Sequence, residues 1–176
     1  TGCIFDTYIT AVDGEDFYMI DQHAAHERIF YEKLVGQYGA DEKVRQMILT
    51  PFTVDVPLSV KENQYDWLDS LRDIGYLIEE FGPNSYIVKE IPDFMEISEA
   101  ENFVKDYIEN VSERDDLGNT VVIDKLITRS CKSAVKAHDH LSAAEIQALI
   151  DQLKLCRNPF SCPHGRPAFI RFSIYD

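Results

Sequence analysis

The sequence is poor in the features that mark secreted and membrane-embedded proteins. Its 176 residues include only four cysteines, which are too few and too scattered for a disulfide scaffold and indicate a reduced, intracellular setting. No apolar run approaches the roughly 20 residues of a membrane-spanning helix, and no signal peptide is visible at the start. The chain begins at Thr1 rather than at a methionine, which indicates a fragment that a leader could have preceded.

Positive charge is also scarce. Against 31 acidic residues stand only 17 lysines and arginines, which leaves a net charge of −14. Taken whole, this charge argues against a simple nucleic-acid coat, because binding to phosphates needs a positive surface. The deficit is local, however: residues 52–117 carry 17 acids and 5 bases, whereas residues 124–171 carry 4 acids and 8 bases. Acidity is therefore a property of the middle of the chain.

The composition that is present is that of a globular protein. Hydrophobic residues make up 45% and charged residues 27%, which excludes a disordered, collagenous or low-complexity chain. The length fits one domain, or one domain with a satellite lobe. Periodicity and turn signals predict an α+β fold with an acidic insertion at about residues 50–118. Strands are expected over residues 4–11, 17–21, 47–56, 77–81, 86–91 and 168–174, and helices over residues 23–37, 59–75, 98–111 and 120–137 and from a capping box at residues 142–145.

A first group of chemically active side chains lies where an expected strand meets an expected helix. Asp21 closes the strand, and His23 and Glu27 share one face of the helix because they are four residues apart. Carboxylates and imidazole together suit zinc, manganese or iron. The alternative is that Asp21 merely caps the helix and Glu27 is a solvated side chain. Glu32 lies off this face and is expected at the surface.

A second group lies in the run from Cys162 to Pro167, which reads Cys-Pro-His-Gly-Arg-Pro. Cys162 and His164 can reach one centre if the loop is extended, and the two prolines stiffen it. The alternative is a buried cysteine beside a structural histidine. Arg166 could hold a phosphate or a carboxylate, or form an internal salt bridge.

A third group is Ser130-Cys131-Lys132. Cys131 falls on the apolar face of an expected helix, where an inert core thiol is the simpler interpretation. Beside it, basic residues recur at helical spacing, which usually marks a solvated face but next to a metal site could hold a DNA backbone. This basic stripe consists of Lys125, Arg129, Lys132 and Lys136.

Read in order, these pieces resemble the C-terminal endonuclease domain of the DNA mismatch repair protein MutL. The run from Asp21 to Glu27, with Glu32 five residues on, fits that family's DQHA(x)2E(x)4E signature. Ser130-Cys131-Lys132 looks like its short cysteine motif, and Cys162 to Pro167 matches its CPHGRP motif in full. Residues 2–11 resemble its opening strand, so the resemblance covers essentially the whole chain.

The resemblance implies a DNA-nicking activity that depends on divalent metal. It implies Zn²⁺ as a regulatory or structural ion and Mn²⁺ or Mg²⁺ for cleavage, with Asp21 and Glu27 as the catalytic carboxylates and the loss of Asp21 abolishing nicking. ATP would be bound only by an N-terminal domain that is absent here. The metal-site residues that it implies are Asp21, His23, Glu27, Cys131, Cys162 and His164.

The resemblance also implies an architecture and partners. Residues 1–49 and 119–176 would form a dimerisation lobe with a mixed or antiparallel sheet that carries the site, and residues 50–118 an external regulatory lobe. The implied setting is the cytoplasm, away from membranes, in a homodimer that meets duplex DNA and the mismatch-recognition protein MutS. The implied DNA contacts are Arg129, Lys132, Lys136 and Arg166.

The segment from Gln46 to Pro51 resembles the family's docking site for the replication sliding clamp, with Gln46, Ile48 and Pro51 as the contacts. An apolar strand that ends at a proline would look the same. For the whole chain, the competing interpretation is a non-catalytic dimerisation scaffold with a structural zinc site. The intact Asp21, His23 and Glu27 argue against it.

Overall fold

The computed structural model describes residues 2–62, 64–112, 127–128 and 141–175. The chain forms two compact units, residues 1–32 with 135–176 and residues 33–134. Both combine helices with an antiparallel sheet, so the expected α+β fold is confirmed. Among the described helices, none has the length and apolar character needed to cross a membrane. Which segments serve dimerisation and which serve regulation stays a prediction.

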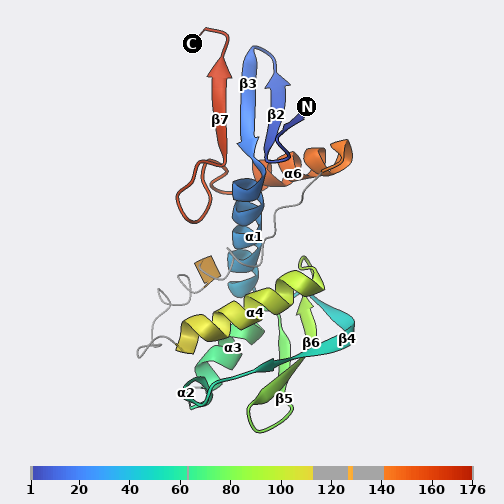
Figure 1. Ribbon diagram of the computed structural model, residues 1–176, viewed down its shortest axis with the longest axis vertical. Helices are drawn as coiled ribbons and strands as arrows, with labels where there is room; N and C mark the ends of the chain where they lie inside the picture. The colour runs from blue at the N-terminus through green and yellow to red at the C-terminus, as the bar shows by residue number, and fades with distance from the viewer. Residues whose placement is uncertain (1, 63, 113–126, 129–140, 176) are drawn as a thin grey trace. The chain divides into compact units, whose positions relative to one another are not determined.

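The first unit is built on a four-stranded antiparallel sheet in the order β1-β2-β3-β7 (Figure 1). Its strands are β1 (Gly2–Ile4), β2 (Tyr8–Asp13), β3 (Asp16–Asp21) and β7 (Phe169–Ser173). The expected hairpin between β2 and β3 is present, and it turns at Gly14, whose φ of +62° suits a residue without a side chain. Because β7 pairs with β3, the C-terminal segment returns to the strand that ends at Asp21.

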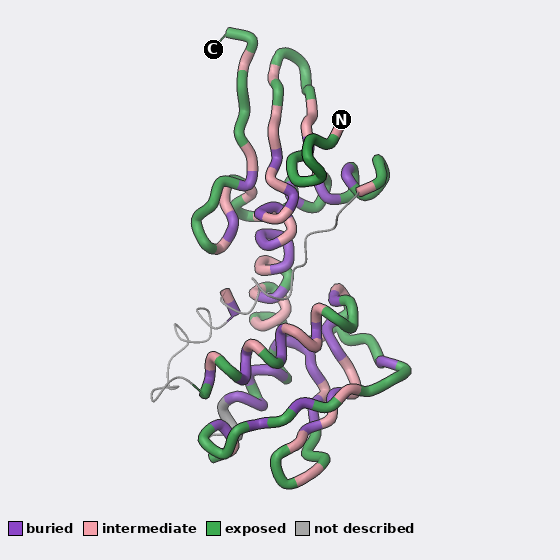
Figure 2. Tube along the Cα trace, viewed as in Figure 1, coloured by how far each residue is buried: buried purple, intermediate pink, exposed green. Residues whose placement is uncertain are grey.

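One face of this sheet packs against two helices, α1 (Gln22–Tyr38) and α6 (Ala143–Leu155). The capping box at the start of α6 is present, with Ser142 and Glu145 each bonded to the other's backbone. Figure 2 shows burial concentrated where α1 meets the sheet, whereas β7 and the far end of β2 are mostly exposed and β3 is mostly half-buried. The shared core consists of Ile9, Ile20, Ala25, Ile29, Ile146, Leu149 and Leu153.

The other face of the sheet is apolar and exposed. Val12 pairs with Phe17, and Phe17 pairs with Phe172, so the three side chains form a row across β2, β3 and β7. Val12 is 72% exposed and Phe172 is 47% exposed. Ile170 lies two residues from Phe172 on the same face and is also exposed. A sheet with helices on one face leaves such a row open to a partner.

The second unit contains a three-stranded antiparallel sheet in the order β4-β6-β5. Its core gathers large aromatic side chains, among them Trp67 edge-on to Tyr86, with ring centroids 5.1 Å apart. The one helix expected over residues 59–75 is two helices, and the first, a single turn, buries only Val60. The elements are β4 (Arg45–Asp55), α2 (Leu58–Lys61), α3 (Gln64–Ile74), β5 (Leu77–Glu80), β6 (Ser85–Pro92) and α4 (Ile97–Ser112).

Strand β4 is irregular in its middle. Its register against β6 shifts between Met47 and Phe52, and such a bulge redirects side chains locally. Within this stretch Ile48 is buried, whereas Met47 is 79% exposed and Leu49 is fully exposed. The side-chain amide of Gln46 donates to the backbone carbonyls of residues 92, 93 and 95.

Candidate metal centre

Asp21 joins three segments of the first unit. Its backbone N–H donates to the carbonyl of Ala168 at 2.8 Å, which connects the end of β3 to the start of β7. Its Oδ1 accepts the N–H of Ala24 at 3.0 Å, as an N-capping aspartate does. The capping role that the sequence left open is therefore present. The expected role of this carboxylate as a metal ligand stays a prediction.

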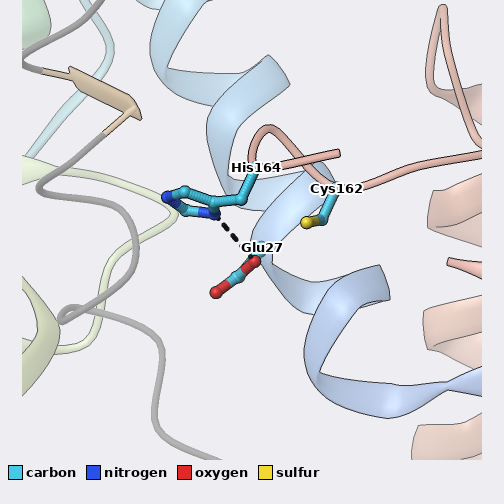
Figure 3. A group of neighbouring side chains, drawn as sticks. All are labelled: Glu27, Cys162 and His164. Carbon is cyan, nitrogen blue, oxygen red and sulfur yellow. Dashed lines mark hydrogen bonds and ion pairs between the residues drawn. The ribbon is translucent and has the colours of Figure 1, made fainter. Parts of the chain in front are cut away.

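Glu27 is the centre of the cluster. It is fully buried one turn along α1 from His23, whose Nε2 lies 2.9 Å from Oε1 of Glu27. Nδ1 of His164 lies 3.2 Å from Oε2 of Glu27, the contact drawn in Figure 3. Arg166 donates from Nη2 to Oε1 at 3.1 Å. The interpretation of Glu27 as a solvated side chain is thus wrong, because the loop after α6 covers it with basic groups.

That loop is a tight turn. The N–H of Cys162 donates to the carbonyl of Arg166 at 2.8 Å, and the N–H of Gly165 donates to the carbonyl of Cys162 at 3.0 Å. Gly165 has a φ of +86°, a conformation that glycine adopts without strain. The turn buries Cys162 and brings it and His164 to the carboxylate of Glu27, as Figure 3 shows.

The surroundings of Glu27 favour its charged form. Burial by itself raises the pKa of Glu27, but hydrogen bonds from Cys162 and His164 and the charge of His23 outweigh it, so the pKa lies below its usual 4.5. Hydrogen bonding with Cys162 raises the pKa of Arg166 above its usual value. Burial lowers this pKa, but the charge of Glu27 raises it further, so the net shift is upward. The cluster is therefore a buried carboxylate that is held ionised and contacts the guanidinium of Arg166.

The donor set suits a divalent metal ion. One ligand atom each from Glu27, Cys162 and His164 lies within 4.8 Å of the others. Ligands of one tetrahedral zinc ion lie roughly 3.5 Å apart, so small side-chain movements would close the site. In addition, Nδ1 of His23 is buried and has no hydrogen-bond partner within the described part of the chain. Thiol, imidazole and carboxylate together fit zinc, and the carboxylate also fits manganese.

The structure brings together only part of the expected ligand set. Glu27, Cys162 and His164 form the cluster, His23 adjoins it through Glu27, and Arg166, expected at DNA, also contacts Glu27. Four expected residues lie outside the described residues and stay predictions: Cys131 as a ligand, and Arg129, Lys132 and Lys136 as DNA contacts. Lys125, the remaining member of the basic stripe, lies outside them too.

Two side chains of α1 were not expected near this loop. Glu32, predicted at the surface, accepts the backbone N–H groups of residues 157 and 158. Arg28, which drew no expectation, is buried and donates to the carbonyl of Ser161. The only signal in the sequence is their spacing of four residues, which allows an Arg–Glu pair on one helix face.

Comparison with known proteins gives a consistent result. The family model described as the MutL C terminal dimerisation domain matches residues 1–141. The DNA mismatch repair protein MutL of Thermoanaerobacter pseudethanolicus is 41% identical over 172 residues, which cover 96% of this chain and 27% of that protein. MutL of Clostridium tetani is 36% identical over 173 residues, covering 97% of this chain and 28% of that protein. The chain thus spans about a quarter of the length of these relatives.

Proposed function

The chain belongs to the family of MutL C-terminal dimerisation domains, and on this premise we propose that it is a metal-dependent endonuclease that nicks duplex DNA. Family membership implies a homodimer and a place in DNA mismatch repair. The observation that carries the proposal of catalysis is the buried Glu27, held ionised in one cluster with Cys162 and His164. An ionised carboxylate beside a thiol and an imidazole is a donor set that can hold a divalent ion.

Each donor has a distinct part in the proposed site. Cys162 and His164 would hold Zn²⁺, and Glu27 and Asp21 would hold the harder Mn²⁺ or Mg²⁺. We retain His23 and Cys131 as further ligands. A bound divalent ion supplies charge relief on phosphoryl oxygens and an activated water. The chain's own contribution is to fix these donors at the start of α1 and to exclude bulk water from Glu27.

The proposed substrate is the DNA backbone. Arg166 is half-exposed while it contacts Glu27, so its guanidinium can face a phosphate beside the metal cluster. Arg129, Lys132 and Lys136 would extend this contact, with weak affinity and no sequence preference. We propose MutS as a partner in the cytoplasm, where it would direct the nicking.

Conversion of supercoiled plasmid to open circles tests the proposed function. With Mn²⁺ we expect nicking that EDTA abolishes. Glu27→Gln keeps the size of the side chain but removes its charge, so we expect nicking and Zn²⁺ affinity to fall at least tenfold. Glu101→Gln is the matched control, because Glu101 is also paired with a base four residues away but lies half-exposed on α4. Normal nicking by Glu27→Gln would refute the role of the cluster.

The same assay separates the competing function, a non-catalytic scaffold with structural zinc. In that case the chain would bind Zn²⁺ and lose stability on chelation, but it would not nick DNA with any divalent ion. The cluster would then stabilise the turn after Cys162 and do nothing more.

We also propose docking on the replication sliding clamp through β4. What supports this is the exposure of Met47 and Leu49 next to Pro51 in the bulged part of the strand. Met47 and Leu49 would then make the contact in place of Gln46 and Ile48, since Ile48 is buried and the amide of Gln46 donates to three backbone carbonyls.

Truncating the exposed pair should therefore weaken clamp binding. For Met47→Ala with Leu49→Ala we expect the Kd for the purified clamp to rise at least tenfold, as the loss of apolar anchors does in other interfaces. Leu58→Ala is the control, because Leu58 is an exposed leucine of the same unit outside the segment. Surface plasmon resonance measures both, and equal affinities would exclude this docking site.

A further inference from the structure

Segment 157–161, which leads into the Cys162 turn, is held against α1 by two charged side chains. The carboxylate of Glu32 accepts the N–H of Arg157 at Oε2 at 2.6 Å and the N–H of Asn158 at Oε1 at 3.0 Å. Both of its oxygens are therefore engaged by backbone amides. Hydrogen bonds to an ionised carboxylate are stronger than those between neutral groups, so this contact fixes where the segment leaves α6.

Arg28 holds the same segment at its other end. Its Nε donates to the carbonyl of Ser161 at 2.5 Å, directly before Cys162. Its Nη1 lies 3.7 Å from Oε1 of Glu32, and its guanidinium stacks 5.5 Å from the centre of the Tyr31 ring. Arg28 is buried, so it has little freedom to move away from the carbonyl.

We infer that Arg28 and Glu32 are positioning residues that set the distance between Glu27 and the turn carrying Cys162 and His164. The inference rests on the proposed metal site. Glu27, Arg28 and Glu32 belong to one helix. The fixed spacing along that helix therefore determines the position of the turn relative to Glu27. Beyond the turn, the carbonyl of Ala168 accepts the N–H of Asp21. The turn is thus fixed at both ends before a metal ion binds.

This arrangement assigns a different part to each acid of α1. The carboxylate oxygens of Glu27 face the cluster. Both oxygens of Glu32 accept backbone N–H groups, so Glu32 ligates no metal. If the turn is already ordered before the metal binds, binding does not include the entropic cost of ordering the turn. Partners that orient ligands in this way typically raise metal affinity by about 10- to 100-fold.

Titration of the 176-residue chain with Co²⁺ tests the inference, because its visible spectrum reports the ligand set. For Glu32→Ala we expect about 10- to 100-fold weaker Co²⁺ binding but an unchanged spectrum at saturation. Glu32→Gln should lose less, since one oxygen can still accept one amide. Glu99→Ala is the control, because Glu99 also accepts a backbone N–H but in α4, and its Co²⁺ affinity should stay unchanged.

Two results of the titration would overturn the inference. Unchanged affinity in Glu32→Ala would show that the contact does not position the turn, and an altered spectrum at saturation would show that Glu32 is itself a ligand.

Hydrogen exchange provides a readout that does not depend on metal. Without Glu32, the amides of residues 157 and 158 should exchange at least tenfold faster, while amides in the β3–β7 ladder keep their protection. Unchanged exchange at residues 157 and 158 would overturn the inference. If the unmodified chain bound no Co²⁺ at all, the proposed metal site would fail, and hydrogen exchange would then decide alone whether Glu32 holds the segment.

Discussion

Asp21→Asn should abolish manganese-dependent nicking while the domain stays folded. Asparagine caps helices about as well as aspartate, so the bond from the N–H of Ala24 to the side chain at position 21 should persist. The bond from the backbone of residue 21 to Ala168 does not involve the side chain. What the substitution removes is the negative charge, which strengthens the binding of a hard divalent ion by an oxygen ligand.

The matched control for this prediction is Asp16→Asn. Asp16 begins the same strand, and its carboxylate pairs with Arg171 at 3.1 Å, away from the cluster. We expect Asp16→Asn to nick as the unmodified chain does. Plasmid nicking with Mn²⁺ and thermal unfolding followed by circular dichroism measure the two effects separately. Normal nicking by Asp21→Asn would show that Asp21 is only a helix cap.

The sequence was sufficient to identify the candidate metal-ligating side chains but not to predict which of them are buried. Asp21, His23 and Glu27 are local in the chain: Asp21 ends the strand, and the shared face of His23 and Glu27 follows from the helical repeat. The complete burial of Glu27 depends on the turn at residues 162–166, which lies some 135 residues later in the chain. Nothing in a spacing of four residues predicts that such a turn will cover the helix.

The fold shows the same division between local and distant causes. The β2–β3 hairpin and the capping box of α6 were predictable, because each is encoded by a few adjacent residues. The bulge in β4 was not, because it arises from pairing with β6, some 40 residues away. Alternation along the strand does give Ile48 pointing inward and Leu49 outward, but it cannot reveal where the pairing with β6 changes register.

Placing a charge in the apolar row of the first sheet should convert the homodimer to monomers. Val12, Phe17 and Phe172 form this row on the face that lacks helices, and the rings of Phe17 and Phe172 lie 6.2 Å apart. Since family membership implies a homodimer, we propose that two copies bury this face against each other. In a twofold-symmetric dimer each substitution occurs on both subunits. One new charge per chain therefore places two unpaired charges in the interface.

For Phe172→Glu we expect the dimer dissociation constant to rise at least a hundredfold, or about 2.7 kcal/mol, which sedimentation velocity over a range of protein concentrations measures. Leu155→Glu is the control, because Leu155 is equally apolar and more exposed but lies on α6, outside the row. Because Phe172 belongs to the exposed face and not to the core shared with α1, the monomer should keep the metal cluster and its Zn²⁺ affinity. A Phe172→Glu chain that remained dimeric would assign the interface to another surface, whereas loss of Zn²⁺ binding together with the dimer would mean that the cluster depends on the partner.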